Sequence, residues 1–170
     1  MPSNVEIKAR LRDPGQVAEV AQRLAGAEPR LIVQHDFFYS VDTGRLKLRC
    51  FPDGSGELIA YGRPDTAGPK ISCYHLFRTD DAEALATVLS ASLAPAGEVR
   101  KERRLFLVGR TRIHLDRVEG LGDFLELEVV LGEGESSAEG DAEARELMDQ
   151  LGILDSDLVE GAYVDHLEGI

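Results

Sequence analysis

The chain has 170 residues, 43% of them hydrophobic and 29% charged, and its formal net charge at pH 7 is −12. This length is enough for one domain with a sizeable core, so we expect a single domain over 1–170. The sequence has no apolar run of about 18 residues and no signal-peptide core near its first residue, which argues against a membrane protein. The cysteines, Cys50 and Cys73, lack metal-ligand spacing and are typical of free thiols in a cytoplasmic protein.

The negative charge is concentrated in the last part of the chain. Residues 133–170 carry 12 acidic side chains and one basic one, whereas residues 1–132 carry 19 acidic and 18 basic side chains. Because binding to long nucleic acid requires a net basic surface, we expect no such partner. A small anion could still bind in a basic pocket of this nearly neutral region.

The first predicted element is a strand. Residues 4–12, NVEIKARLR, alternate between apolar and polar or charged side chains, which is the period of a strand with one apolar face. Asp13 and Pro14 follow as a helix N-cap and a first-turn proline, and they predict a helix that ends near Gly26.

The rest of the chain continues with strand patterns and two more helices. The further expected strands are 31–40, 44–51, 57–65, 70–78, 99–108 and two within 111–131. The further expected helices are 80–93 and 141–152, the second after a polar linker at 132–140. Because short turns join most strands, the pattern predicts an α+β fold with a largely antiparallel sheet of seven or eight strands.

Each expected strand carries ionic residues on one side. A sheet with one face on a core and the other in water produces the same alternation. Two observations favour a shared function instead. The bases cluster on these strands, and fifteen of the nineteen are arginines, whose planar guanidinium suits phosphate oxygens.

If the sheet closes into a barrel, these ionic sides line its lumen and the helices cover the outside. Like charges 4 Å apart then repel by about 4 kcal/mol at an effective dielectric near 20, so a polyanionic ligand would relieve the strain. Glu126 and Glu128, two residues apart on one strand, point the same way and can hold a hard cation such as Mg²⁺ or Mn²⁺.

Six segments between residues 4 and 131 resemble the CYTH family, the triphosphate tunnel metalloenzymes. In chain order they are VEIKAR, GRLKLR, LIAYGRPD, VRKERRLFL, TRIHLD and FLELEVVL. This family includes class IV adenylyl cyclases, thiamine triphosphatases and inorganic tripolyphosphatases. The resemblance implies a closed or nearly closed antiparallel eight-stranded β-barrel, a tunnel with a charged lumen and flanking helices. It also implies a triphosphate ligand and Mg²⁺ or Mn²⁺ as cofactor.

The resemblance further implies roles for individual residues. The phosphate-binding residues would be Lys8, Arg45, Lys47, Arg49, Arg63, Lys70, Lys101, Arg103 and Arg112. The catalytic residues among them would be Lys8, Arg49, Lys101 and Arg103. The metal ligands would be Glu6, Glu126 and Glu128, with Asn4, Glu57 and Asp116 as further candidates. We expect His114 to be a hydrogen-bonded structural histidine, and Tyr61 and Tyr74 to be packing residues.

Asn4 departs from the family pattern, because it stands where the opening Glu-x-Glu-x-Lys motif has its first glutamate. Asparagine still offers a carbonyl oxygen to a cation, but the site loses one negative charge. We therefore expect Asn4→Glu to lower the Mg²⁺ or Mn²⁺ concentration needed for activity. An unchanged metal dependence would mean that Asn4 lies outside the coordination sphere.

These observations lead to an expected function, the metal-dependent hydrolysis of tripolyphosphate or of a small organic triphosphate such as thiamine triphosphate. Two alternatives stay open: a class IV adenylyl cyclase that converts ATP to cyclic AMP and pyrophosphate, and a non-catalytic triphosphate- or polyphosphate-binding module. By analogy with oxyanion stabilisation, we expect Arg49→Ala or Arg103→Ala to reduce turnover by roughly 100-fold or more with the fold intact.

Overall fold

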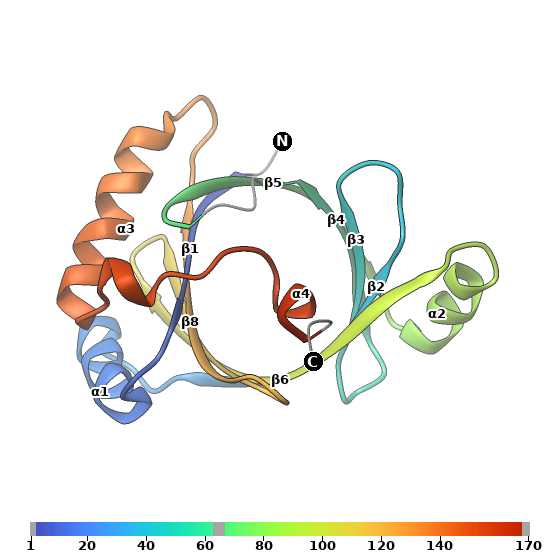
Figure 1. Cartoon of the computed structure of the whole chain (residues 1–170), viewed down its shortest axis with the longest axis horizontal. Helices are drawn as coiled ribbons and strands as arrows, with labels where there is room; N and C mark the ends of the chain where they lie inside the picture. The colour runs from blue at the N-terminus through green and yellow to red at the C-terminus, as the bar shows by residue number, and fades with distance from the viewer. Residues whose placement is uncertain (1–2, 63–66, 168–170) are drawn as a thin grey trace.

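The computed structural model describes residues 3–62 and 67–167. Eight strands form a closed barrel in the order β1-β5-β4-β3-β2-β6-β7-β8, and every neighbouring pair is antiparallel (Figure 1). The strands are β1 (Ser3–Arg10), β2 (Arg30–Tyr39), β3 (Arg45–Cys50), β4 (Gly56–Gly62), β5 (Lys70–Thr79), β6 (Pro95–Val108), β7 (Thr111–Val118) and β8 (Gly122–Val130). The predicted eight-stranded antiparallel barrel with flanking helices is therefore confirmed.

The helices of the described residues flank this barrel or, in the case of α4, lie at one of its ends (Figure 1). They are α1 (Pro14–Ala25), α2 (Ala82–Ser90), α3 (Ser137–Leu151) and α4 (Tyr163–Leu167), with a 3₁₀ turn, η1, at Asp155–Asp157. Figure 1 shows α1 and α3 on one side of the barrel, α2 on the opposite side, and α4 within the ring of strands in this view. None of the helices in the described part of the chain has the length and hydrophobicity to cross a bilayer.

Local signals set the ends of α1. The side chain of Asp13 accepts a hydrogen bond from the backbone N–H of Gln16 at 3.1 Å, and Pro14 occupies the first turn. Gly26 ends the helix in a left-handed conformation, with φ of 67°, that residues with a Cβ rarely adopt. The helix predicted from these three residues is confirmed.

Helix α3 begins at Ser137, so its first turns lie within the linker expected at 132–140. Glycine usually indicates a loop, but Gly140 serves close packing here. A Cβ at this position would lie 2.7 Å from Cγ2 of Val5, so the missing side chain lets α3 sit directly on β1. The contact between α3 and β1 is a tertiary feature that the local composition does not indicate.

Strands β1, β7 and β8 turn apolar residues outward, toward α1 and α3. Ile7 of β1, Ile113 of β7 and Leu127 of β8 are fully buried in a core that also contains Val17 of α1 and Met148 of α3. Because side chains alternate along a strand, the intervening ionic residues of these strands point into the barrel. This hydrophobic cluster thus lies outside the lumen, whereas a second one, which includes Phe38, Val99 and Tyr163, also lines the cavity.

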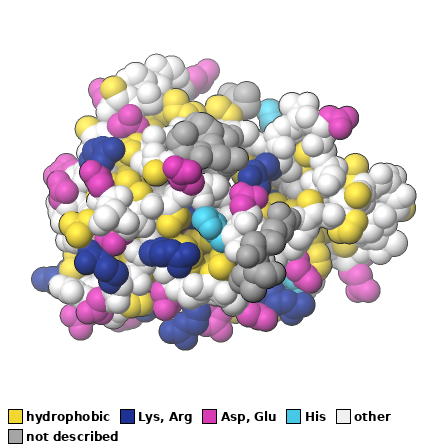
Figure 2. All heavy atoms as spheres, in the orientation of Figure 1, with side chains coloured by type: hydrophobic (Ala, Val, Ile, Leu, Met, Phe, Trp, Pro, Cys, Tyr) yellow, Lys and Arg dark blue, Asp and Glu magenta, His cyan; other side chains and the backbone are white. Residues whose placement is uncertain are grey.

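The last described segment, residues 158–167, crosses one end of the barrel, and we call it the C-terminal strap. Leu158 forms a β-bridge with Ala9, and the N–H of Val159 donates to the carbonyl of Lys8 at 3.0 Å. Tyr163 then packs edge-on against Phe124 of β8, with ring centroids 5.0 Å apart. The strap therefore covers this end of the lumen with side chains, and Figure 2 shows interspersed acidic and basic residues on the same face of the molecule.

Candidate functional site

The barrel encloses a cavity of about 1100 Å³ whose wall is rich in charge. Its basic lining residues are Lys8, Arg30, Lys47, Arg49, Arg78, Lys101, Arg103 and Arg112. Its acidic lining residues are Glu6, Asp36, Asp53, Glu57, Glu126 and Glu128. The ionic sides of separate strands thus converge on one internal space, and the interpretation of a sheet face open to water is wrong.

Most residues proposed for the site from the sequence lie on this wall. Those that line the cavity are Asn4, Glu6, Lys8, Lys47, Arg49, Glu57, Lys101, Arg103, Arg112, Glu126 and Glu128. The tunnel brings them together from β1, β3, β4, β6, β7 and β8. Arg63 lies outside the described residues.

Three of the proposed residues are not part of the cavity wall. Arg45 donates two hydrogen bonds to the carboxylate of Asp165 in α4, at 3.1 and 2.7 Å, and so holds the C-terminal strap. Lys70 is buried and lies opposite Glu6 in the β1–β5 register. Asp116 is buried against Arg103, as described below.

Asp36, which the sequence analysis did not select, organises one wall of the tunnel. Nε and Nη2 of Arg49 donate to its two carboxylate oxygens at 2.8 Å each, and Nζ of Lys47 lies 3.4 Å away. Burial alone would raise the pKa of Asp36, but Arg49, Lys47 and Lys101 together lower it well below its usual range. Asp36 alternates with Gln34 and Phe38 on the side of β2 that lines the cavity, and this alternation was the available sequence signal.

A second buried pair joins β6 and β7. Nε and Nη2 of Arg103 donate to the two oxygens of Asp116 at 2.7 Å each, and Nη2 also donates to Glu126 at 3.0 Å. Asp116, which is 1% exposed, accepts a further hydrogen bond from the hydroxyl of Tyr163 at 2.9 Å. Burial, then Glu126 and Asp116, raise the pKa of Tyr163, so its hydroxyl keeps its proton. Asp116 therefore accepts hydrogen bonds from Arg103 and Tyr163 and does not line the cavity.

Two lysines lie where the strap meets the lumen. Nζ of Lys8 lies 4.0 Å from the ring centroid of Tyr163, donates to the carbonyl of Gly161 at 3.2 Å and lies 3.4 Å from Glu126. Nζ of Lys101 lies 5.0 Å from the same ring centroid. Burial, then the charges of Arg103 and Arg49, lower the pKa of Lys101 to about 7. Tyr163 was not predicted from the sequence, because the strap reaches the tunnel only in the folded chain.

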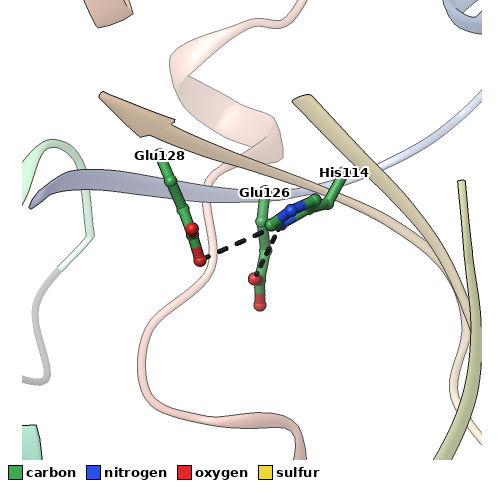
Figure 3. A group of neighbouring side chains, drawn as sticks. All are labelled: His114, Glu126 and Glu128. Carbon is green, nitrogen blue, oxygen red and sulfur yellow. Dashed lines mark ion pairs between the residues drawn. The ribbon is translucent and has the colours of Figure 1, made fainter. Parts of the chain in front are cut away.

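Glu126 and Glu128 form an acidic group with His114 on the neighbouring strand (Figure 3). Nδ1 of His114 lies 3.8 Å from Oε2 of Glu126 and 3.9 Å from Oε1 of Glu128. Burial acts to raise the pKa of Glu126, but Lys8 and Arg103 outweigh it and keep the carboxylate ionised. Burial, then Arg103, lower the pKa of His114, so its ring favours the neutral form.

The donor set of this wall fits a divalent cation. Two carboxylates supply charged oxygens, and Nδ1 of His114 beside them has no hydrogen-bond partner within the described parts of the chain. Elsewhere on the lining, Oδ1 of Asn4 and Oε1 of Gln34 are also without a partner among these residues. A buried polar atom without a partner costs free energy unless a bound group satisfies it, and a cation would do so for Nδ1 of His114. Glu6, on the same wall, adds a third carboxylate to the cavity.

A closed antiparallel barrel with a basic lumen and an acidic wall defines a tunnel protein suited to polyanions and a metal ion. The chain belongs to the CYTH family, because the CYTH domain matches residues 3–163. The comparison with curated proteins finds no match.

Solved structures show the same fold at low sequence identity. The PH1012 protein of Pyrococcus horikoshii OT3 superposes with a TM-score of 0.84 and 21% identity, over 95% of this chain and 98% of that one. A proposed adenylate cyclase of Vibrio parahaemolyticus superposes with a TM-score of 0.78 and 20% sequence identity, over 97% of both chains. A proposed adenylyl cyclase of Hippeastrum is described as having a dominant triphosphatase activity. It superposes with a TM-score of 0.64 and 15% sequence identity, over 96% of this chain and 93% of that one. At these identities the likeness concerns the fold alone.

Proposed function

We propose that the protein is a metal-dependent triphosphatase that binds its substrate inside the tunnel. The substrate would be tripolyphosphate or a small organic triphosphate such as thiamine triphosphate. The observation that carries this proposal is the convergence of eight basic side chains from different strands on one enclosed cavity, beside an acidic wall. Membership of the CYTH family supports it as well.

The ion pairs of the lumen suggest how metal and substrate would bind together. Lys8 and Arg103 contact Glu126, and Nε of Arg112 donates to Glu128 at 2.9 Å. With both glutamates engaged by a divalent cation, these bases would turn to phosphate oxygens as their new acceptors. The two binding events would therefore favour each other.

The proposed chemistry is phosphoryl transfer to water. Lys8, Lys101 and Arg49 would orient the phosphate chain and neutralise the charge that develops on the leaving group. Asp36 and Asp116 would hold Arg49 and Arg103 in place through their bidentate hydrogen bonds. A divalent ion, when bound, supplies charge neutralisation and lowers the pKa of its bound water.

An apolar rim favours a substrate with an organic group. Ile32, Phe51 and Leu105 line the end of the cavity opposite the C-terminal strap, close to Arg30. A cavity of about 1100 Å³ is slightly larger than the usual small-molecule site of roughly 300–1,000 Å³. The same rim also supports the second candidate function, a class IV adenylyl cyclase, which needs a nucleoside site beside the phosphate tunnel.

Product analysis tests the proposal. The purified chain is incubated with tripolyphosphate, thiamine triphosphate or ATP, with Mg²⁺, with Mn²⁺ or with EDTA. We expect phosphate release that stops in EDTA. Cyclic AMP with pyrophosphate would favour the cyclase, and tight binding without any product would favour a binding module.

Two variants of β7 provide a matched pair for this assay. Arg112 lines the tunnel, whereas Arg117 lies on the same strand with its side chain 73% exposed. We expect Arg112→Gln to reduce turnover by about 100-fold, as for the loss of one charge-stabilising donor, and Arg117→Gln to leave it unchanged. Equal activities of the two variants would contradict the proposed tunnel site.

A further inference from the structure

His114 has surroundings that a structural histidine would not have. The residue is 5% exposed, and its Nδ1 atom has no hydrogen-bond partner in residues 3–62 and 67–167. A buried imidazole nitrogen normally finds a donor or an acceptor, because leaving it unpaired costs free energy. The expectation of a hydrogen bond at His114 therefore does not hold for Nδ1.

The strand register directs this atom toward two carboxylates. His114 lies opposite Glu126, and Arg112 lies opposite Glu128, in the antiparallel pair of β7 and β8. Directly opposite and diagonal residues on one face of such a pair are within side-chain reach. Figure 3 shows the ring of His114 turned toward both glutamates, and all three residues line the cavity.

The distances in this group suit a shared ligand better than a hydrogen bond. Nδ1 lies 3.8 Å from Oε2 of Glu126 and 3.9 Å from Oε1 of Glu128, beyond the usual hydrogen-bond length. Two ligand atoms about 2.1–2.2 Å from one ion are about 3.0–3.1 Å apart in octahedral and about 3.4–3.6 Å apart in tetrahedral coordination. The three atoms, which all lie within 4.8 Å of one another, can therefore converge on one cation after side-chain movements of less than about 1 Å.

A nitrogen ligand changes which ion the site prefers. Mg²⁺ takes oxygen ligands and keeps much of its water, whereas imidazole is a frequent ligand of first-row transition metals. We propose that Nδ1 of His114 is a metal ligand beside Glu126 and Glu128, and that this mixed site binds transition-metal dications such as Mn²⁺ and Co²⁺ in preference to Mg²⁺. The inference rests on the proposed metal-dependent function and adds its ion specificity.

Mn²⁺ tests this assignment directly, because its electron spin reports bound nitrogen. The full-length protein is titrated with Mn²⁺ without substrate, the free ion is followed by its electron paramagnetic resonance signal, and Mg²⁺ is added as competitor. Pulsed measurements then detect ¹⁴N coupling to the bound ion. We expect ¹⁴N coupling in the wild type and Mn²⁺ affinity at least tenfold above that for Mg²⁺.

The variants separate a ligand from a neighbour. His114→Gln keeps most of the side-chain volume, and we expect it to abolish the ¹⁴N coupling and weaken Mn²⁺ binding at least tenfold, with Mg²⁺ binding changed less than threefold. His75→Gln, at an exposed position of β5, is the matched control and should behave as the wild type.

Two outcomes distinguish this inference from the proposed function. Wild-type protein that binds Mn²⁺ and hydrolyses a triphosphate, but shows no ¹⁴N coupling, overturns the role of His114 and leaves the triphosphatase proposal standing. Wild-type protein that neither binds Mn²⁺ nor hydrolyses any triphosphate overturns both. Because the decisive spectrum is that of the wild type, the test holds even if a variant fails to fold.

Discussion

The two faces of β8 differ in what their side chains do. Leu125 and Leu127 are fully buried in the core that includes residues of α1 and α3, whereas Glu126 and Glu128 line the cavity. Complete burial of one such leucine stabilises a fold by about 1.5–3 kcal/mol, but a buried charge costs free energy unless it is paired. The apolar outer face therefore stabilises the barrel, whereas the burial of charged groups on the inner face lowers its stability and serves binding.

The largest effect is expected where the inner face also supports the fold. Arg103→Ala should reduce turnover by about 100-fold and lower the free energy of unfolding by about 3–5 kcal/mol, because Asp116 would remain buried without its partner. Steady-state kinetics and urea unfolding measure the two losses. This revises the expectation that the fold stays intact.

A second substitution tests that explanation. Adding Asp116→Asn to Arg103→Ala removes the unpaired carboxylate, so it should recover part of the stability and none of the activity. If Arg103→Ala by itself unfolds at the wild-type urea concentration, the buried pair does not stabilise the barrel.

Neighbouring residues of β8 give the next test. Leu127→Ala removes buried methyl groups from the outer core and should cost about 2–5 kcal/mol in urea unfolding, with turnover of the folded fraction retained. Glu128→Gln should change stability by less than about 1 kcal/mol, since Arg112 beside it is partly exposed, yet abolish metal-dependent turnover. If Leu127→Ala lost turnover with its stability unchanged, and Glu128→Gln lost stability with its turnover unchanged, the two faces would not have these separate roles.

Tyr163→Phe tests whether the strap contributes to the inner face. The substitution removes the hydroxyl that donates to Asp116 and keeps the ring against Phe124. Since hydrogen bonds to charged groups contribute about 1.5–3 kcal/mol, urea unfolding should show a loss in this range. Tyr39→Phe, on β2, is a control that leaves the strap unchanged. If Tyr163→Phe loses no more free energy of unfolding than Tyr39→Phe does, the strap hydroxyl does not stabilise the inner face.

The smallest predicted effect depends on pH. With a pKa of about 7, Lys101 is mostly neutral above pH 7 in the free protein, and a bound triphosphate would favour its charged form. Binding should therefore take up a proton, and affinity should fall by up to about tenfold per pH unit above pH 7.

Lys101→Arg provides the comparison, because arginine stays charged throughout this range. Calorimetric titration with tripolyphosphate in EDTA, from pH 7 to 8.5, should give a shallower pH dependence for Lys101→Arg than for the wild type. The ligand's own titration is common to both proteins and cancels, so identical slopes would mean that Lys101 does not titrate on binding.

The elements of the fold could be predicted because their signals are local. Alternation over 4–12 and the residues Asp13, Pro14 and Gly26 are read within a few positions, and β1 and α1 follow them. The closed barrel itself came from the resemblance to the CYTH family, since a half-wetted sheet has the same alternation. Gly140 suggested a loop, but it is needed for the close packing of α3 on Val5 of β1, a residue that is distant in the sequence.

The sequence predicted which types of residue line the site, but not which side chains form ion pairs and hydrogen bonds with one another. Lys8, Arg49 and Arg103 line the tunnel as expected, yet Arg45 holds the strap through Asp165. Asp36 was not selected, because the alternation of β2 places it on a face with Gln34 and Phe38 but does not identify Arg49 as its partner.

The sequence by itself determined which side chains share a face of each strand, because the alternation of a pleated backbone is a property of adjacent residues. Only the tertiary structure decided what each face meets. Closure of β1 against β8 turned the ionic sides inward, and the register set His114 beside Glu126. The strap brought Tyr163 to Asp116 across 47 positions of the chain. Charges act over a few ångströms of space, and those distances exist only once the barrel has closed.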